Sequence, residues 1–233
     1  GGTGALRLAA DLIKQQFPGR SVWLSDPTWP NHGGLFAAAG VPMQTYPYVD
    51  ADNRLDFAAM MAAVRQIPEG DILLLHGCCH NPTGFDLSLE QWRELAGVIA
   101  ERGLLPLVDL AYQGFGDGLD ADAYGVRLLA ETIPNMMITT SCSKNFGIYR
   151  ERTGCLIVVA ANADETRSVR SQIAVIARGI YSTPPSHGAA LVAEILGSEE
   201  LVALWKEELD AMRERINTVR AQLVDAMEAY GLR

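Results

Sequence analysis

The sequence contains no long hydrophobic run and no excess of positive charge. No apolar stretch approaches the roughly 18 residues of a membrane-spanning helix, and no signal peptide is visible at its start. The net charge of −9 at pH 7 argues against nucleic acid or an anionic membrane as a partner. We therefore expect a cytoplasmic protein with neither kind of partner.

Cysteine is sparse, and repeats and low-complexity segments are absent. Cys78 and Cys79 are adjacent and Cys142 and Cys155 are isolated, so none has the spacing of metal ligands. In a long acidic chain we interpret them as reduced thiols, buried near strand ends as small apolar residues. We expect no metal site.

The 233 residues are 48% hydrophobic and 20% charged, a normal balance for a chain that buries a core. Short apolar runs alternate with helical patterns, and such runs are typical of parallel strands buried on both faces. The pattern predicts an α/β fold of three layers, α/β/α, with a mostly parallel central sheet. The expected strands are 21–25, 41–46, 71–76, 104–109, 136–140 and 155–160, and the expected helices are 5–16, 57–66, 88–102, 164–178, 187–196 and 199–228.

Polar clusters follow four of the expected strands, at 26–32, 76–84, 109–115 and 141–144. Ligands of open α/β sheets bind beyond the carboxyl ends of the strands. Because the four clusters would converge on one edge of the sheet, the sequence predicts a single site there.

Lys144 is the most informative residue of these clusters. It follows an apolar run that ends in hydroxyl side chains, and Arg152 lies eight residues beyond it. This setting suits an amine that condenses with a carbonyl next to a phosphate. The alternative is a surface lysine in a loop. The glycines of 1–4 precede a helix, whose N-terminus could hold the phosphate.

Other residues in the clusters could bind a flat, charged ring. Asp109 could pair with a protonated ring nitrogen, Trp29 could stack on the ring, and Asn81 and Tyr112 could donate hydrogen bonds to a phenolic oxygen. The alternatives are a turn or capping aspartate, a core tryptophan, a turn-forming Asn-Pro pair and a core tyrosine. His32 and His76 lie near the expected site as support or as buried histidines, and His80 and His187 are interpreted as structural.

Taken in order, these motifs resemble those of the class I (fold type I) aminotransferases that use pyridoxal 5′-phosphate, and they are most similar to the aspartate and aromatic amino-acid subgroup. The resemblance runs through nearly the whole chain. It is carried by Gly1–Leu6, Pro27–His32, His76–Gly84, Asp109–Phe115, Ser143–Gly147 with Arg152, and Arg178–His187.

The resemblance implies a role for each residue. Lys144 would form the Schiff base and then act as the base of the proton shift, while Asp109 would pair with the pyridine nitrogen, supported from behind by His32. Tyr112 and Asn81 would bond the phenolic oxygen. Trp29 would stack on the ring and, with Asn81, touch the substrate, whose side-chain carboxylate Arg178 would grip in the neighbouring subunit's site. Candidates for the phosphate are Gly2, Thr3, Ser141 and Arg152, with Ser143 a weaker match.

The implied function is transamination between an aspartate or aromatic amino acid and 2-oxoglutarate by a homodimer. Two alternatives stay open: a cofactor-binding fragment without turnover, and another pyridoxal-phosphate reaction on the same fold. We expect 1–233 to be the cofactor-binding large domain, cut at both ends, so that an N-terminal arm and a small domain are absent. A long helix at about 199–231 would lead toward the missing small domain. We therefore expect weak or no activity from the chain alone. The resemblance also predicts cis bonds at Asp26-Pro27 and Asn81-Pro82.

Overall fold

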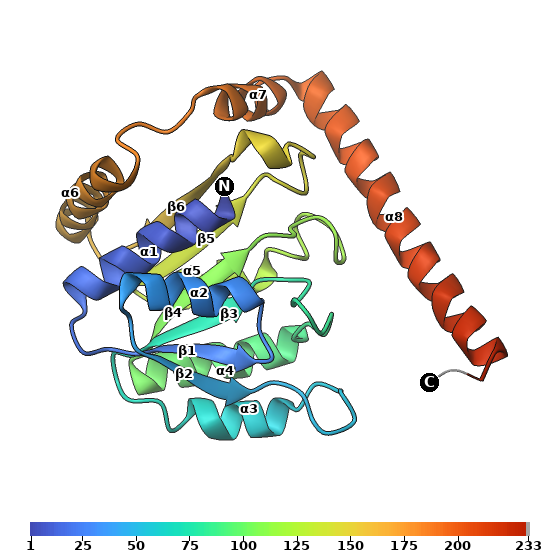
Figure 1. Cartoon of the computed structure of the whole chain (residues 1–233), viewed down its shortest axis with the longest axis horizontal. Coiled ribbons are helices and arrows are strands. Elements are labelled where there is room, and N and C mark those ends of the chain that lie inside the picture. Colours follow the sequence, from blue (N-terminus) through green and yellow to red (C-terminus); the bar gives the residue numbers. More distant parts are fainter. Residues whose placement is uncertain (232–233) are drawn as a thin grey trace.

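Apolar runs of five or six residues form the strands of one sheet. The structure is a computed structural model that describes residues 1–231 (Figure 1). The strand order is β2-β1-β3-β4-β5-β6, and the first five strands are parallel, whereas β6 runs antiparallel to β5. The strands are β1 (Val22–Asp26), β2 (Met43–Pro47), β3 (Ile72–His76), β4 (Leu105–Leu110), β5 (Met136–Ser141) and β6 (Gly154–Val159). The predicted, mostly parallel α/β fold is therefore confirmed.

Helices cover both faces of this sheet. The α1, α2 and α6 helices pack on one face, and α3, α4 and α5 pack on the other. The helices are α1 (Gly2–Gln16), α2 (Pro30–Ala39), α3 (Phe57–Val64), α4 (Leu89–Arg102), α5 (Tyr124–Thr132), α6 (Ala163–Ile180), α7 (His187–Leu196) and α8 (Glu199–Ala229), with a short 3₁₀ turn, η1 (Tyr149–Glu151).

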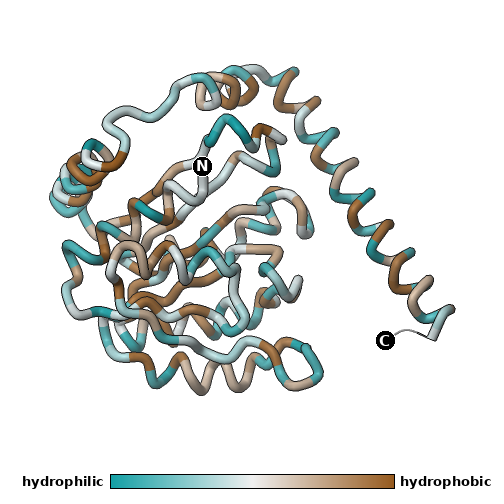
Figure 2. The backbone as a smooth tube through the Cα atoms, in the orientation of Figure 1, coloured by the Kyte–Doolittle hydropathy of each residue, from teal (hydrophilic) through white to brown (hydrophobic). Residues whose placement is uncertain are grey.

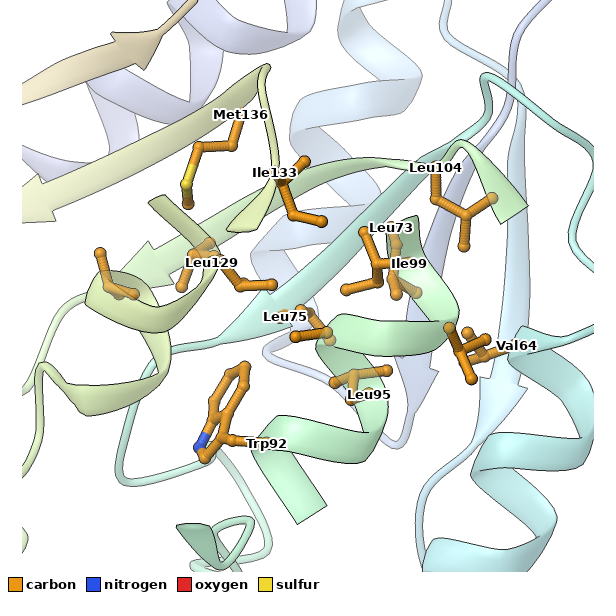
Figure 3. Close-up of a cluster of buried hydrophobic side chains, with 14 of the residues drawn as sticks. Val64, Leu73, Leu75, Trp92, Leu95, Ile99, Leu104, Leu129, Ile133 and Met136 are labelled. Atoms are coloured by element: carbon orange, nitrogen blue, oxygen red, sulfur yellow. The ribbon is translucent and has the colours of Figure 1, made fainter. Parts of the chain in front are cut away.

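Each face has its own apolar core, because successive side chains of a strand point to opposite faces. Along β3, Leu73 and Leu75 pack against α4, whereas Ile72 and Leu74 pack in the cluster beneath α1. Figure 3 shows the first cluster, where Trp92, Leu95 and Ile99 lie on one side of α4 and face the sheet. This double-sided burial holds the ends of the central strands in fixed positions.

The ends of α4 show how local sequence sets an element. The Ser88 side chain accepts a hydrogen bond from the Gln91 backbone, and the Gln91 side chain accepts one from the Ser88 backbone. This reciprocal capping box begins the helix that was predicted at 88–102, and the helix ends at Gly103, which has a left-handed conformation with φ 62°.

Two helices were not predicted. The α2 helix begins at Pro30, a residue that suits the first helical position, within a segment interpreted only as a polar cluster after a strand. The α5 helix has nine residues and contains Gly125, so its apolar period is short.

Both predicted cis bonds, Asp26-Pro27 and Asn81-Pro82, are present.

The α8 helix has 31 residues and extends away from the layered body (Figure 1). Hydrophobic residues recur along its length in Figure 2, and many of them, such as Val219 and Leu223, are exposed. Among residues 1–231, no helix is both long and apolar enough to cross a membrane.

Candidate functional site

A cavity of about 300 Å³ lies at the carboxyl ends of β3, β4 and β5, beside the start of α1. All four predicted polar clusters supply lining residues; the cluster after β1 supplies only Trp29. The lining consists of Gly2, Thr3, Leu6, Trp29, His76, Cys78, Asn81, Asp109, Ala111, Tyr112, Ser141, Ser143, Lys144, Tyr149 and Arg152. The predicted convergence is therefore observed, and the volume is at the lower end of the range of small-molecule sites.

Lys144 lies in the turn after β5, with its side chain in the cavity. Its Nζ is 4.4 Å from the centroid of the Tyr112 ring. Burial is the main cause that lowers the pKa of Lys144; the positive charge of Arg152 lowers it further, and the carboxylate of Asp109 opposes the shift. A larger fraction of this amine is therefore neutral at a given pH than in an ordinary lysine. The chain has only two other lysines, Lys14 and Lys206, and both are exposed.

Asp109 is buried near the end of β4 and is held on both carboxylate oxygens. Thr139, its register partner on β5, donates a 3.0 Å hydrogen bond to Oδ1. His32 Nε2 lies 3.1 Å from Oδ2. Because a carboxylate oxygen accepts, His32 presents an N–H to Asp109. The carboxylate is thereby fixed in orientation while it faces the cavity.

The network continues behind His32. The Thr28 hydroxyl lies 2.8 Å from His32 Nδ1 and 3.2 Å from His76 Nε2. With Nε2–H used for Asp109, His32 Nδ1 accepts from Thr28, whose oxygen can then accept from His76. Burial, with neighbouring His80 and His32, holds the pKa of His76 well below its usual value. A neutral His76 completes a chain of hydrogen bonds directed at Asp109.

His80 anchors the loop that carries Asn81. Its Nε2 lies 2.9 Å from the Ser25 hydroxyl and its Nδ1 lies 2.9 Å from the Thr83 hydroxyl. The Tyr48 ring stacks on it at 3.9 Å between centroids. Burial lowers the pKa of His80 to about 4. These contacts are those of a structural histidine, as the sequence predicted.

The part of the cavity at the start of α1 is suited to an anion, and we refer to it as the anion end. The α1 helix begins at Gly2, so its N-terminus contributes free backbone N–H groups and partial positive charge. A Cβ on Gly2 would lie 3.2 Å from Ser141 Cβ, which leaves little room for a side chain there. Thr3, Ser141 and Ser143 line this end of the cavity, and the exposed Arg152 adds the guanidinium.

Asn81 and Trp29 also line the cavity. Asn81 Nδ2 is 3.5 Å from the Tyr112 hydroxyl, so both polar groups converge on one point of the cavity. The Trp29 ring meets the His32 ring edge-on at 5.2 Å.

His32 lies behind Asp109, as the family resemblance implied, but the other supports of this carboxylate were not identified from the sequence. Thr28 and Thr139 were seen only as members of polar runs, although the pairing of Thr139 with Asp109 across adjacent strands was a usable signal.

Arg178 lies exposed on α6 and does not line the cavity. Within residues 1–231, no cluster of three or more His, Cys, Asp or Glu could hold a metal ion.

Comparison with known proteins identifies the family. The model of "Aminotransferase class I and II" matches residues 1–233. An aromatic-amino-acid aminotransferase of Pseudomonas aeruginosa is 59% identical over 232 residues, which cover 100% of this chain and 58% of the relative. An aspartate aminotransferase of Haemophilus influenzae is 48% identical, with 99% and 59% covered.

Solved structures agree with these relatives. An aromatic amino acid aminotransferase from Burkholderia cenocepacia J2315 has a TM-score of 0.96 and 49% identity, covering 98% of this chain and 58% of that one. Its counterpart from Burkholderia pseudomallei, covalently bound to pyridoxal phosphate, has a TM-score of 0.96 and 45% identity, covering 99% and 58%. The chain spans a little under three-fifths of the length of these relatives. It belongs to the class I and II aminotransferase family, as the motifs predicted.

Proposed function

We propose that this member of the aminotransferase family forms a pyridoxal-phosphate site for amino-group transfer between an aspartate or aromatic amino acid and 2-oxoglutarate. One observation carries the proposal: a half-buried amine, a fixed carboxylate and an anion-binding helix start line a single cavity. Lys144, Asp109 and Gly2 with Arg152 supply these three features.

The chemistry of this donor set fits the cofactor. Pyridoxal phosphate, when bound, supplies an aldehyde that reacts with primary amines and a ring that accepts electrons from the substrate. Its three polar parts are the aldehyde, the ring nitrogen and the phosphate. The cavity has a matching group for each part: Lys144 for the aldehyde, Asp109 for the ring nitrogen and the start of α1 for the phosphate.

Lys144 is proposed as the nucleophile and the proton carrier. Its lowered pKa favours the neutral amine, which is the form that attacks a carbonyl and removes a proton. After it is released by the substrate amine, Nζ would take the proton from the substrate Cα and deliver it one step later to the carbon that was the aldehyde carbon of the cofactor. Burial and the positive charge of Arg152 disfavour the charged form of this amine, whose Nζ lies over the face of the Tyr112 ring.

Asp109 is proposed to hold a proton on the ring nitrogen. An ionised carboxylate beside a ring nitrogen favours the protonated ring, and bonds from Thr139 and His32 fix the direction of the carboxylate. Tyr112 and Asn81 would donate hydrogen bonds to the phenolic oxygen. Trp29 would cover one side of the ring and limit access of water.

The anion end is proposed to hold the phosphate. Backbone N–H groups at Gly2 and Thr3, hydroxyls of Ser141 and Ser143, and the Arg152 guanidinium would supply the donors. A dianion held by Arg152 would weaken the influence of Arg152 on the pKa of Lys144.

The relatives support the substrate class. The identity is 59% to an aromatic-amino-acid aminotransferase and 48% to an aspartate aminotransferase, so an aromatic substrate is favoured within the proposed pair.

Asn81 and Trp29 are proposed to contact the substrate. Arg178, which is exposed on α6, is proposed to reach a second subunit's site in a cytoplasmic homodimer. Residues 1–233 are proposed as the large, cofactor-binding domain.

The proposal is tested by cofactor attachment. The protein would be incubated with pyridoxal phosphate, reduced with borohydride and digested, and the modified peptide identified by mass spectrometry. We expect the modification on Lys144 and its loss in Lys144→Ala. Lys14→Ala and Lys206→Ala, which remove the exposed lysines, should keep the modification on Lys144.

Because weak or no turnover is expected of residues 1–233 alone, amino-group transfer is measured separately on the full-length protein, as glutamate formed from 2-oxoglutarate with tyrosine, phenylalanine or aspartate. We expect Lys144→Ala to lower the rate by about 10²–10⁴-fold, the usual contribution of a positioned acid–base group. Attachment without glutamate formation would refute transamination but keep the cofactor site. Absence of any adduct on Lys144 would refute both.

A further inference from the structure

The first half of α8 packs onto the two loops that supply Lys144 and Tyr112. Leu209 of α8 is fully buried, and Trp205 and Arg213 are partly buried, whereas most of the later residues of the helix are exposed. The packed part of α8 therefore meets the body of the protein at the back of the candidate site.

Trp205 holds the backbone directly after Lys144. Its indole N–H donates a 2.7 Å hydrogen bond to the carbonyl of Asn145. Its ring stacks on Phe146, with centroids 4.4 Å apart and planes 10° apart. Two consecutive residues after Lys144 are thus fixed by one side chain of α8.

The loop that carries Tyr112 is held by the same helix. Arg213 donates a 3.2 Å hydrogen bond to the carbonyl of Gly114. Gly114 has φ 99°, and a Cβ at this position would overlap the side chain of Leu209. The close approach of α8 to this loop therefore depends on glycine.

The two loops are also joined to each other. Asn145 Nδ2 donates a 3.3 Å hydrogen bond to the carbonyl of Gln113, which follows Tyr112. Since Lys144 Nζ lies 4.4 Å from the centre of the Tyr112 ring, both reactive side chains belong to a unit that α8 closes from behind.

We propose that Trp205 is a positioning residue for Lys144, and that it sets the placement of the lysine against Tyr112 through the Asn145 carbonyl and the Phe146 ring. The inference rests on the proposed role of Lys144. A residue that serves only core packing would be a buried apolar side chain. Trp205 is only partly buried, and its one polar group, the indole N–H, donates its hydrogen bond to the turn that carries Lys144.

The expected consequence is a change in the protonation of Lys144. The ionisable groups that line the cavity with it are Asp109 from β4, Tyr112 after β4, His76 and Cys78 from the end of β3, and Tyr149 and Arg152 from η1 and its end. Loss of the α8 contact should let the turn relax toward solvent. Burial would then depress the pKa of Lys144 less, and the fraction of neutral amine at a given pH would fall.

The experiment uses cofactor-free protein and acetic anhydride, with the acetylation of each lysine followed by mass spectrometry. For each lysine, the ratio of its acetylation rate at pH 8 to that at pH 10 reports the protonation of the amine, because the accessibility of the amine affects both rates alike. We expect Trp205→Ala to lower this ratio at Lys144 by about twofold or more, and Trp205→Phe, which keeps a ring but lacks the N–H, to give a smaller decrease. The ratios at Lys14 and Lys206 should stay constant.

The control is Leu204→Ala, which changes the exposed neighbouring residue on the same helix. An unchanged Lys144 ratio in Trp205→Phe and Trp205→Ala would overturn the inference, even if both variants were less stable. If Trp205→Ala does not fold, Trp205→Phe carries the test. Because no cofactor is used, the result does not depend on cofactor attachment, whose failure would refute the proposed function instead.

Discussion

His80 is a buried histidine held by hydroxyl groups on both ring nitrogens, and its setting makes stability depend on pH. Burial lowers its pKa to about 4, from 6.5 in the unfolded chain. Between these values the unfolded chain binds a proton that the folded protein does not, so acid favours unfolding. Above pH 6.5 both states are neutral and the effect vanishes. The free energy of unfolding should therefore fall by roughly 2 kcal/mol through this group between pH 7 and pH 5.

This contribution is measured by urea unfolding at the two pH values. In His80→Gln the decrease between pH 7 and pH 5 should be smaller than in the wild type by about that amount. The baseline at pH 7 should also drop, because Ser25 and Thr83 lose a partner. His187→Gln, which changes an exposed histidine on α7, should keep the wild-type decrease. Equal pH dependence in His80→Gln and the wild type would contradict the prediction.

Lys144, Asp109 and Asn81 could be predicted as neighbours because each lies just beyond or near the end of a parallel strand, and such ends meet at one edge. His32 was expected behind Asp109 from the family resemblance, but sequence order alone could not show Thr28 or Thr139. The contact of Thr28 with His32 and His76 depends on how α2 leaves β1, and α2 was not predicted. Residues that touch the cavity were therefore easier to find than residues that support it.

At the scale of elements, the packing of α4 against α5 is governed by a glycine. A Cβ on Gly125 of α5 would overlap the indole of Trp92 on α4. Gly97, on the exposed side of α4, has no atom near the position of a Cβ. Gly97→Ala should therefore raise the free energy of unfolding by up to about 1 kcal/mol, the helix-propensity gain. Gly125→Ala should lower it by roughly 1–3 kcal/mol, the usual cost of overpacking.

Urea unfolding of the two variants checks this pair. The double variant Gly125→Ala with Trp92→Leu removes the overlapping ring, so its loss should be less than the sum of the two single losses. If Gly125→Ala raised the free energy of unfolding, α4 and α5 would separate without cost, and this would contradict the close contact of Gly125 with Trp92.

The same residues explain why α5 escaped prediction. Glycine inside a nine-residue segment weakens the helical signal, and the reason for the glycine lies on another helix. By contrast, α4 carries its signals locally, in Ser88, Gln91 and Gly103, and it was predicted with nearly its observed bounds. Elements whose limits are set by their own caps could be read from the sequence, whereas elements shaped by a neighbour could not.

At the scale of the whole molecule, the layered body and α8 differ in how they are stabilised. The sheet buries side chains on both faces, whereas α8 is anchored through Trp205, Leu209 and Arg213 and then extends beyond the body (Figure 1). Beyond Arg213, Ile216, Leu223 and other apolar side chains are 37% to 58% exposed along the helix. The amphipathic pattern predicted this helix but could not show where its packed part ends.

This division predicts unequal protection from hydrogen exchange along α8. Helices shorter than about 12–15 residues are marginal in water without packing, and 216–229 is such a segment. In the 233-residue chain its amides should exchange faster than those of 201–213, with α4 as the slow reference. Leu209→Ala should extend fast exchange into 201–213 because it removes the anchor, whereas Leu223→Ala should leave that segment unchanged. Slow exchange throughout 216–229 would contradict the prediction and would mean that the apolar side of this segment is buried. If the exchange rate then fell with rising protein concentration, a second copy of the chain would be the partner that buries it.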